Sequence, residues 1–355
     1  MKALVLAGGA GTRLRPITHT SAKQLVPVAN RPVLFHALDA VAAAGIREVG
    51  VVVGDTEPEI RAAVGDGSAF GLEVTYLRQE APLGLAHAVL VAGPWLGDEP
   101  FLMYLGDNVL VGGVTELVDE FTGWYDRGEA DATILLTRVP DPSQFGVAEL
   151  GPDGRVVRLE EKPAAPRSDL ALAGVYLFGP AVHEAVAAIR PSARGELEIT
   201  DAIQWLIDTG RAVRSHVVKG YWKDTGRVED LLDANRTMLD LLVRRVDGEV
   251  DDATTVTGAV VVEAGAVVRG SRLVGPLVLD AGTTVSGSTV GPYASVGPDC
   301  SLVDTVLTDS IVLAGTTLHG GHLDGCLLGR EVDVRLPVGG SRLRLVLGDH
   351  GSVAS

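Results

Sequence analysis

The chain has 355 residues, 46% of them hydrophobic and 21% charged, and its formal net charge at pH 7 is −16. This length predicts two domains of ~100–200 residues each, and the negative charge excludes a protein that binds nucleic acid through a basic face. No apolar run is long enough to cross a bilayer, and the N-terminus has no signal-peptide pattern, so we expect a cytoplasmic protein without a membrane partner. Any anionic substrate must therefore meet local cations or a metal ion.

The chain begins with a strand and a glycine-rich turn. Residues 3–7 form an apolar run typical of a buried strand, and three glycines follow within residues 8–11. Glycine lets the backbone approach a ligand closely, and peptide N–H groups exposed in such a turn can hold phosphate oxygens. Arg13 comes next, and Lys23 lies ten residues further on. The spacing matches neither the dinucleotide fingerprint nor the P-loop, but a glycine turn with two cations predicts a triphosphate pocket.

After this turn, strand-like and helix-like patterns alternate up to about residue 240. Apolar residues at helical spacing predict helices, and short apolar runs predict strands. The expected helices cover residues 33–44, 57–64 and 86–92, and the expected strands cover residues 49–53, 74–77 and 101–105. Such alternation favours an α/β domain with a mainly parallel sheet. Ligands bind beyond the carboxyl ends of these strands, where Gly8, Gly54 and Asp107 all occur, so we expect one shared cleft.

Two aspartates in glycine-flanked turns are candidate metal ligands. Asp107 follows the strand at residues 101–105, and Asp224 lies in the segment GYWKDTG at residues 220–226. Mg²⁺ prefers hard oxygen ligands and is usually held by one or two carboxylates together with substrate phosphates. The pattern alone also suits turn-forming aspartates. In a chain with a phosphate-type loop, we favour a Mg²⁺ site.

Two further segments carry side chains suited to a base and a sugar. Gln79 follows a strand, and its amide can both donate to and accept from a base edge, while Gly84 would allow close backbone approach. Glu161 can accept hydrogen bonds from sugar hydroxyls. Lys162 beside it reaches the same cleft only if the strand ends there, because side chains alternate along a strand. The alternative interpretation of the Gln79–Gly84 segment is a plain loop between a strand and a helix. The alternative for Glu161 and Lys162 is a run of solvated charges.

Arg194 in a glycine turn is a candidate phosphate clamp. The segment RGELEITD at residues 194–201 opens a predicted helix, and Glu196 and Glu198 favour a helix N-terminus through the helix dipole. A simple capping loop remains the alternative interpretation.

After about residue 240, Gly and Val dominate and a new period begins. An aliphatic residue recurs every six positions, as at Val256, Val262, Val268 and Val274. This period, with small residues between, predicts a parallel β-helix over residues 250–340, with slips near residues 285–290 and after 302. We expect a linking helix over residues 231–243. Residues 342–347 alternate like a half-exposed strand that caps the stack.

The cysteines and the C-terminal histidines point to structure more than to chemistry. Cys300 and Cys326 make no disulfide framework, and we interpret both as small core residues. His319, His322 and His350 lie in or beside the predicted β-helix. Some hexapeptide-repeat proteins are acyltransferases with a histidine base. Because no basic site for coenzyme A accompanies these histidines, we interpret them as turn residues.

Taken together, the motifs occur in the order of one family. The string LAGGAGTRLRP at residues 6–16, followed by Lys23, resembles the signature of the sugar-1-phosphate nucleotidylyltransferases. The later motifs are similar to those of glucose-1-phosphate thymidylyltransferases, namely FGV at 145–147, EEKP at 160–163, RGELEITD at 194–201 and WKDTG at 222–226. The resemblance implies a Rossmann-like nucleotidyltransferase domain over residues 1–240. As in the long form of the family, it also implies a left-handed β-helix domain over residues 241–355.

The resemblance also implies roles for single residues. Catalysis would depend on Arg13, Lys23 and Lys162. The nucleotide would be bound by Leu6, Ala7, Gly8, Gly9, Gly11, Thr12, Gln79, Pro82, Gly84 and Asp107. The sugar phosphate would be bound by Gly146, Glu161, Lys162, Leu172, Gly174, Arg194 and Trp222. Asp107 and Asp224 would hold Mg²⁺.

The implied reaction is in-line attack by glucose 1-phosphate on the α-phosphorus of dTTP, which gives dTDP-glucose and pyrophosphate. No protein nucleophile is needed, so catalysis would depend on positioning and charge neutralisation. A UTP-using enzyme stays open as an alternative, because the thymine methyl group is worth only about 1–3 kcal/mol. An additional acyltransferase activity and a non-catalytic regulatory subunit also stay open. Lys223 departs from the aliphatic residue usual in the short form, so that form's tetramer contacts do not transfer, and we expect a homo-oligomer of unknown size.

Overall fold

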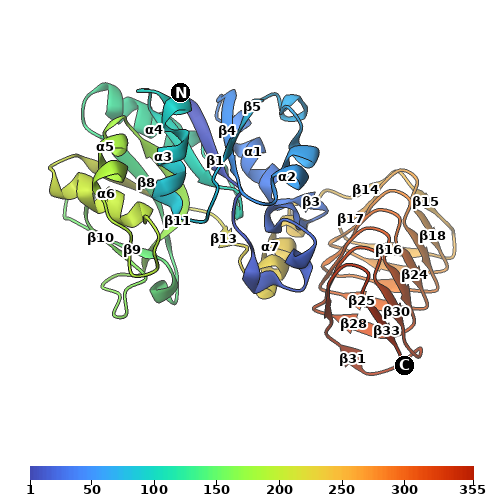
Figure 1. Cartoon of the computed structure of the whole chain (residues 1–355). Coiled ribbons are helices and arrows are strands. Elements are labelled where there is room, and N and C mark those ends of the chain that lie inside the picture. Colours follow the sequence, from blue (N-terminus) through green and yellow to red (C-terminus); the bar gives the residue numbers. More distant parts are fainter. The chain divides into compact units, whose positions relative to one another are not determined.

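The computed structural model describes residues 1–355, and their contacts divide the chain into two compact units (Figure 1). The first unit comprises Met1–Ala10 and Leu34–Asp224, and the second comprises Gly11–Val33 and Thr225–Ser355. Residues 11–33 therefore fold with the C-terminal part of the chain. None of the helices is both long enough and apolar enough to span a membrane.

The first unit is built on a nine-stranded sheet. Its strands are β1 (Lys2–Leu6), β4 (Glu48–Val53), β5 (Glu73–Arg78), β6 (Phe101–Leu105), β8 (Ala132–Arg138), β9 (Gly146–Leu150), β10 (Val156–Glu161), β11 (Leu170–Phe178) and β12 (Val213–Val217). The order is β10-β9-β11-β6-β1-β4-β5, with β8 paired to β11 and β12 paired to β8. Strands β5, β4, β1 and β6 run parallel, whereas β11 is antiparallel to β6, β8 and β9. This mixed, mostly parallel sheet confirms the predicted α/β class.

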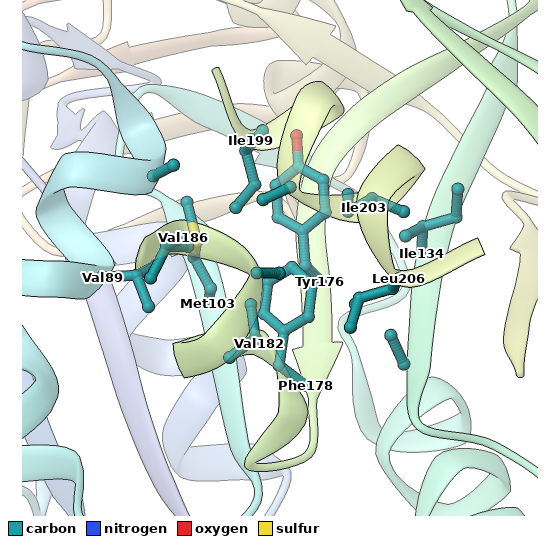
Figure 2. Close-up of a cluster of buried hydrophobic side chains, with 14 of the residues drawn as sticks. Val89, Met103, Ile134, Tyr176, Phe178, Val182, Val186, Ile199, Ile203 and Leu206 are labelled. Carbon is teal, nitrogen blue, oxygen red and sulfur yellow. The ribbon is translucent and has the colours of Figure 1, made fainter. Parts of the chain in front are cut away.

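Helices cover the sheet and complete its core. They are α1 (Val33–Ala43), α2 (Glu57–Val64), α3 (Leu85–Leu96), α4 (Thr115–Asp126), α5 (Ala181–Ala188) and α6 (Ile199–Asp208). One apolar cluster joins α3, α5 and α6 to the strands, and Figure 2 shows Tyr176 and Phe178 of β11 at its centre. Their rings stack with centroids 5.8 Å apart. Ile199, Ile203 and Leu206 recur at helical spacing on α6 and are buried in this cluster, so one apolar stripe holds the helix to the sheet.

The predicted elements of this unit agree with the structure except at their ends. The helix expected over residues 57–64 is confirmed as α2. The helix expected over residues 86–92 is longer, because α3 continues past Pro94 and ends before Gly97. Strand β11 was not predicted, although all nine of its residues are buried, as in the central strand of a covered sheet.

The second unit contains three sheets of parallel strands, the arrangement of a parallel β-helix (Figure 1). The first sheet comprises β14 (Arg245–Val246), β17 (Val260–Val262), β20 (Leu277–Leu279), β23 (Ala294–Val296), β26 (Ser310–Val312), β29 (Leu327–Leu328) and β32 (Val346–Leu347). The second comprises β15 (Glu249–Val250), β18 (Val267–Arg269), β21 (Thr284–Ser286), β24 (Ser301–Val303), β27 (Thr317–His319), β30 (Asp333–Arg335) and β33 (Ser352–Ala354). The third comprises β16 (Thr255–Thr257), β19 (Arg272–Val274), β22 (Thr289–Val290), β25 (Val306–Thr308), β28 (His322–Asp324) and β31 (Arg342–Leu343). The predicted β-helix is thus confirmed, and its three sheets are consistent with the left-handed form.

The coils of the β-helix are shorter than a strict six-residue period requires. Equivalent positions are 17 residues apart between Ser271 and Ser288, and 16 residues apart between Ser310 and Cys326. Compared with the 18 residues of three six-residue sides, a coil is therefore one residue short in the first case and two residues short in the second. As a result Leu273, not Val274, is the buried residue of its strand. The slips in the six-residue period, near residues 285–290 and after 302, occur where a side of a coil is shortened.

The last part of the chain forms a final coil and not one capping strand. Residues 342–347 divide into β31 and β32, which lie in two different sheets. Cys300 and Cys326 are buried and unbridged in the β-helix, which confirms them as core residues. His319 and His322 end β27 and begin β28, so they are strand residues at a coil corner.

Helix α7 (Val228–Asp240) and the segment 11–33 complete the second unit. The helix begins three residues earlier than the expected 231–243. The segment contains the short helical turns η1 (Thr12–Leu14), η2 (Ile17–His19) and η3 (Lys23–Leu25), and then the hairpin strands β2 (Pro27–Val28) and β3 (Arg31–Pro32).

Candidate active site

The first unit has a cleft of about 210 Å³ at one end of its sheet, lined largely by residues of the predicted site. Those that line it are Asp107, Gly146, Glu161, Lys162, Leu172, Gly174, Arg194, Trp222 and Asp224. They come from the ends of β6, β9 and β10, from the irregular middle part of β11, from the turn before α6, and from a small ribbon that pairs β7 (Asn108–Leu110) with β13 (Trp222–Asp224). Residues far apart in the sequence thus meet in one cleft.

The end of β10 brings Glu161 and Lys162 to the same cleft. Strand β10 ends at Glu161, and Lys162 has a φ of 44°, in the left-handed region. Because the backbone turns there, the alternation of side chains stops, and both residues line the cleft. The N–H of Lys162 donates to the carbonyl oxygen of Phe145 at 3.0 Å, which fixes this turn against β9.

A carboxylate network holds Arg194 in the cleft. Its guanidinium donates to Glu161 Oε1 at 3.0 Å and to Glu198 Oε1 at 2.9 Å. Glu198 is 5% exposed and also accepts from Ser192 Oγ at 2.7 Å. Helix α6 begins only at Ile199, and Glu198 makes no side-chain cap. Glu198 thus lies at the N-terminus of α6, as predicted, and its carboxylate also binds Arg194, which was not predicted.

Burial shifts the pKa values of two side chains that line the cleft, Glu161 and Tyr176. Burial raises the pKa of Glu161 above its ordinary value, and the charges of Lys162 and Arg194 offset this only in part. Burial also raises the pKa of Tyr176, as do the negative charges of Glu161 and Asp107. Tyr176, which lines the cleft, is therefore a neutral hydroxyl at pH 7.

Two glycines lie in the wall of the cleft, and the packing is especially close at Gly146. A Cβ atom built on Gly146 would lie 2.5 Å from Thr200 Cγ2 and 2.7 Å from Leu172 Cδ1. Gly174 has a φ of 70° in the irregular part of β11. Trp222 Nε1 donates to the carbonyl oxygen of Ala173 at 2.8 Å, so the indole is anchored to that part of β11.

The two predicted metal ligands are adjacent through the β7–β13 ribbon. Its register pairs Asp224 with Asn108, the residue directly after Asp107. Asn108 Nδ2 donates to Asp107 Oδ1 at 2.9 Å. Asn108 is 2% exposed, and its Oδ1 has no hydrogen-bond partner. Two carboxylates and an amide oxygen are hard donors, which fits a small divalent cation.

Among the cleft residues that the sequence analysis did not predict, Asn108 and Glu198 make contacts with predicted site residues. Asn108 directly follows the predicted metal ligand Asp107, so its position in the motif was the available signal. Glu198 was interpreted as a helix-terminal residue, and no local pattern indicated its contact with Arg194.

The predicted base-binding residues form a second group in the first unit. Gln79 Nε2 donates to the carbonyl oxygen of Gly84 at 3.1 Å and lies 2.9 Å from His87 Nδ1. Its Oε1 lies 3.9 Å from a Cβ built on Gly8, so Gln79 is beside the glycine turn. Gly84 has a φ of 104°, and a Cβ there would lie 2.3 Å from the carbonyl oxygen of Leu197.

The other predicted nucleotide residues divide between the two units. In the first, the N–H of Gly106 donates to the carbonyl oxygen of Leu6 at 2.9 Å, which joins the ends of β1 and β6. Ala7 is buried, whereas Gly9 and Pro82 are exposed. The predicted residues of the second unit are Gly11, Thr12, Arg13 and Lys23. Gly11 packs on Lys23, since a Cβ built on it would lie 2.8 Å from Lys23 Cβ.

Comparison with known proteins gives one consistent result. Residues 2–240 match the profile of the Nucleotidyl transferase family. A glucose-1-phosphate thymidylyltransferase of Streptomyces griseus is 60% identical over 352 residues, which are 99% of this chain and 98% of that protein. Another, of Streptomyces antibioticus, is 58% identical over 355 residues, 99% of each chain. The crystal structure of a putative glucose-1-phosphate thymidylyltransferase from Bacillus anthracis has a TM-score of 0.63 and 33% identity, and it covers 69% of this chain and 98% of its own.

Proposed function

Because this chain belongs to the nucleotidyl transferase family, with full-length relatives among the glucose-1-phosphate thymidylyltransferases, we propose that it makes dTDP-glucose and pyrophosphate from dTTP and glucose 1-phosphate. The catalytic region is residues 1–240, supported by the extent of the family match, and the β-helix domain is residues 241–355. An enzyme that uses nucleoside triphosphates and sugar phosphates works in the cytoplasm, where both occur.

The observation that carries this proposal is the composition of the cleft. A sugar needs hydrogen-bonding groups on a close-packed wall, which Glu161 and Gly146 supply together with Leu172 and Gly174. Its phosphate needs cations, which Lys162 and Arg194 supply at the same cleft. Trp222 closes that wall. One phosphorylated sugar therefore satisfies both halves of the cleft.

The nucleotide is assigned to the glycine turn and the Gln79 loop. A pyrimidine N3–H can donate to Gln79 Oε1, since Gln79 Nε2 is engaged by Gly84. Gly8 and Gly9 bring the backbone close to the nucleotide, together with Leu6, Ala7, Gly11, Thr12 and Pro82. Arg13 and Lys23 hold the triphosphate and the departing pyrophosphate. Thymine and uracil share N3–H, so this contact does not separate dTTP from UTP.

The balance of charge in the cleft supports a divalent metal. Five acidic side chains line it, Asp107, Glu161, Glu196, Glu198 and Asp224, against the cations Lys162 and Arg194. Two anionic substrates would be repelled by this excess of carboxylates. Asp107 and Asp224, with Asn108 beside them, would hold Mg²⁺. When bound there, the ion would supply positive charge to the phosphate oxygens and help to orient them.

The reaction transfers a nucleotidyl group without a protein nucleophile. A phosphate oxygen of glucose 1-phosphate forms a bond to the α-phosphorus of dTTP, and the bond from that phosphorus to the β-phosphate oxygen breaks. Pyrophosphate leaves with the electron pair. Lys162 orients the attacking phosphate, and Arg13 and Lys23 stabilise the charge on the leaving group. The sugar phosphate is ionised at pH 7, so no strong base is required.

The deciding experiment measures pyrophosphate release and identifies the nucleotide sugar formed. The full-length protein is supplied with Mg²⁺ and glucose 1-phosphate, and with dTTP, UTP or no nucleotide. We expect rapid release with dTTP and none without nucleotide or with EDTA. Equal or better use of UTP would keep the reaction but change the nucleotide. No release with any nucleotide would overturn the proposal in favour of a regulatory subunit. Light scattering in the same buffer tests the expected homo-oligomer.

A further inference from the structure

The segment 11–33, which carries Arg13 and Lys23, folds against α7 and the β-helix. Contacts place it in the second unit with Thr225–Ser355. Within the segment, Thr18 Oγ1 donates to the carbonyl oxygen of Gly11 at 2.7 Å, and Gly11 packs on Lys23. The two cations therefore belong to one compact loop, whose position depends on what holds the segment.

The tip of the β2–β3 hairpin is a strained turn held by two long-range hydrogen bonds. Ala29 and Asn30 have φ values of 49° and 60°, in the left-handed region that an alanine rarely adopts. The N–H of Ala29 donates to Asn235 Oδ1 at 2.8 Å, and Asn30 Nδ2 donates to the carbonyl oxygen of Val296 at 2.7 Å. Since strained backbone persists only where its surroundings hold it, these bonds fix the tip.

Asn235 connects the hairpin, α7 and the β-helix through one oxygen atom. It is fully buried on α7, and its Oδ1 accepts a second hydrogen bond from Ser295 Oγ at 2.6 Å. Its Nδ2 is buried without a partner. Reversing the amide would place Nδ2 against the donor of Ala29, so the orientation is determined. A buried amide with an unpaired donor is unfavourable for stability alone, which points to a positioning role.

Other contacts make this support rigid. Arg236 Nε of α7 donates to Asp309 Oδ1 of the β-helix at 2.6 Å, and Arg344 pairs with Glu229. Nearer the loop, Thr20 Oγ1 donates to Asp349 Oδ2 at 2.8 Å in the last coil. The segment is thus attached to the β-helix in two different coils, through Val296 of β23 and through Asp349 of the last coil.

We propose that α7 and the β-helix position the Arg13–Lys23 loop for nucleotidyl transfer, and that Asn30 and Asn235 are positioning residues of this reaction. The inference relies on the proposed function, in which Arg13 and Lys23 hold the triphosphate. The β-helix then contributes to each turnover by fixing the direction of two cations. It does so without supplying a residue that touches substrate.

The test uses the full-length variant Asn30→Gly. Glycine keeps the positive φ but removes the hydrogen bond to Val296. We expect kcat/KM for dTTP to fall at least tenfold and the inhibition constant of pyrophosphate to rise by a similar factor. The KM for glucose 1-phosphate should stay within twofold, because its proposed ligands are untouched. Hydrogen exchange should accelerate in residues 11–33 and not in the coils.

A matched control and a second variant keep the test decisive. Thr305→Ala removes a buried β-helix hydroxyl that donates to Gly320 O at 3.0 Å, and it should leave all kinetic constants unchanged. Asn235→Leu should repeat the effects of Asn30→Gly. Wild-type pyrophosphate inhibition in Asn30→Gly, or an equal loss in Thr305→Ala, would overturn the positioning role. Inactivity of the wild-type protein with every nucleotide would instead overturn the proposed function.

Discussion

At the scale of single residues, the cations of the cleft are held by carboxylates. Arg194 binds Glu161 and Glu198, and Lys162 Nζ lies 3.6 Å from Glu161 Oε1. A cation held in this way has a fixed direction before substrate arrives, which reduces the reorganisation needed during the reaction. The incoming phosphate must also compete with those carboxylates. This competition is the physical reason to expect a metal ion at Asp107 and Asp224.

Replacing one proposed metal ligand should abolish turnover without unfolding the protein. In Asp224→Asn we expect a fall in kcat of about 10²–10³-fold, since a preoriented charge at the reacting phosphate is lost. Pyrophosphate release is measured across a Mg²⁺ titration, with Asp153→Asn in the exposed β9–β10 turn as the matched control. Near wild-type turnover in Asp224→Asn would remove this aspartate from the proposed metal site.

The raised pKa of Glu161 predicts a specific pH dependence of stability. A carboxyl whose pKa is higher in the folded state binds protons more strongly there than in the unfolded chain. Its favourable contribution is present near pH 4.5, the ordinary value, and is lost as the pH rises through the folded-state pKa. The melting temperature of Glu161→Gln minus that of wild type should therefore increase from pH 4.5 to pH 7.

Glu57→Gln is the control of opposite sign. A hydrogen bond from Arg61 lowers the pKa of Glu57, so its contribution is present above the ordinary value and is lost as the pH falls. The melting temperature of Glu57→Gln minus that of wild type should therefore increase as the pH falls through the ordinary value, whereas the corresponding difference for Glu161→Gln decreases in that direction. A flat difference for Glu161→Gln would contradict the burial argument.

Residue types were easier to predict from the sequence than their contacts. The motifs gave nine residues that line one cleft, including Lys162, whose side chain reaches it because β10 ends there. Glu198 was assigned to the helix dipole, because a local pattern cannot show that a buried carboxylate binds Arg194. The sequence also could not show that Asn108 Oδ1 is buried without a hydrogen-bond partner, because its surroundings depend on the pairing of β7 with β13.

At the scale of elements, the wall proposed to bind the sugar depends on close contact between β9, β11 and α6. Gly146 opens β9, and Thr200 of α6 and Leu172 of β11 fill the space that a side chain would need. The sequence showed a glycine after Phe145 but not its neighbours. Strand β11 was missed altogether, because its apolar run has no periodicity that separates a strand from a helix.

A methyl group at Gly146 should damage both packing and sugar binding. Gly146→Ala forces a contact of 2.5 Å with Thr200 Cγ2, and such overpacking costs about 1–3 kcal/mol. We expect a lower melting temperature and a raised KM for glucose 1-phosphate, with the KM for dTTP little changed. Gly123→Ala in α4 is the control, because its nearest atom is the flexible end of Arg127. Equal behaviour of the two variants would contradict this account of the wall.

At the scale of the whole molecule, the boundary between units does not follow the order of the chain. Residues 11–33 leave the sheet unit and join the β-helix unit. A sequence period can reveal a β-helix, but it cannot reveal that an early loop docks on it. That docking depends on buried polar atoms such as Asn235 Oδ1, which no pattern of hydrophobic residues encodes.

Removing the β-helix should therefore affect catalysis as well as assembly. A chain that ends at Asp240 keeps α7 but loses Val296 and Asp349, two attachment points of the loop. We expect at least a tenfold loss of pyrophosphate release per soluble protein, because small misplacements of positioning groups are costly. Full-length protein prepared in parallel is the reference. A soluble and fully active truncated protein would restrict the β-helix to assembly or regulation.

The two attachment levels also restrict how this chain can change length over evolution. The attachment residue Val296 ends β23, and the attachment residue Asp349 follows β32 closely. Strands β26 and β29 lie between β23 and β32 in the same sheet. Repeat proteins commonly gain or lose whole repeats. Here an added coil between these levels would carry Asp349 away from Thr20 by about 4.8 Å, the spacing of neighbouring strands. The number of coils between Val296 and Asp349 is therefore fixed by the two attachments. We expect duplicated coils to be tolerated only outside this part of the β-helix.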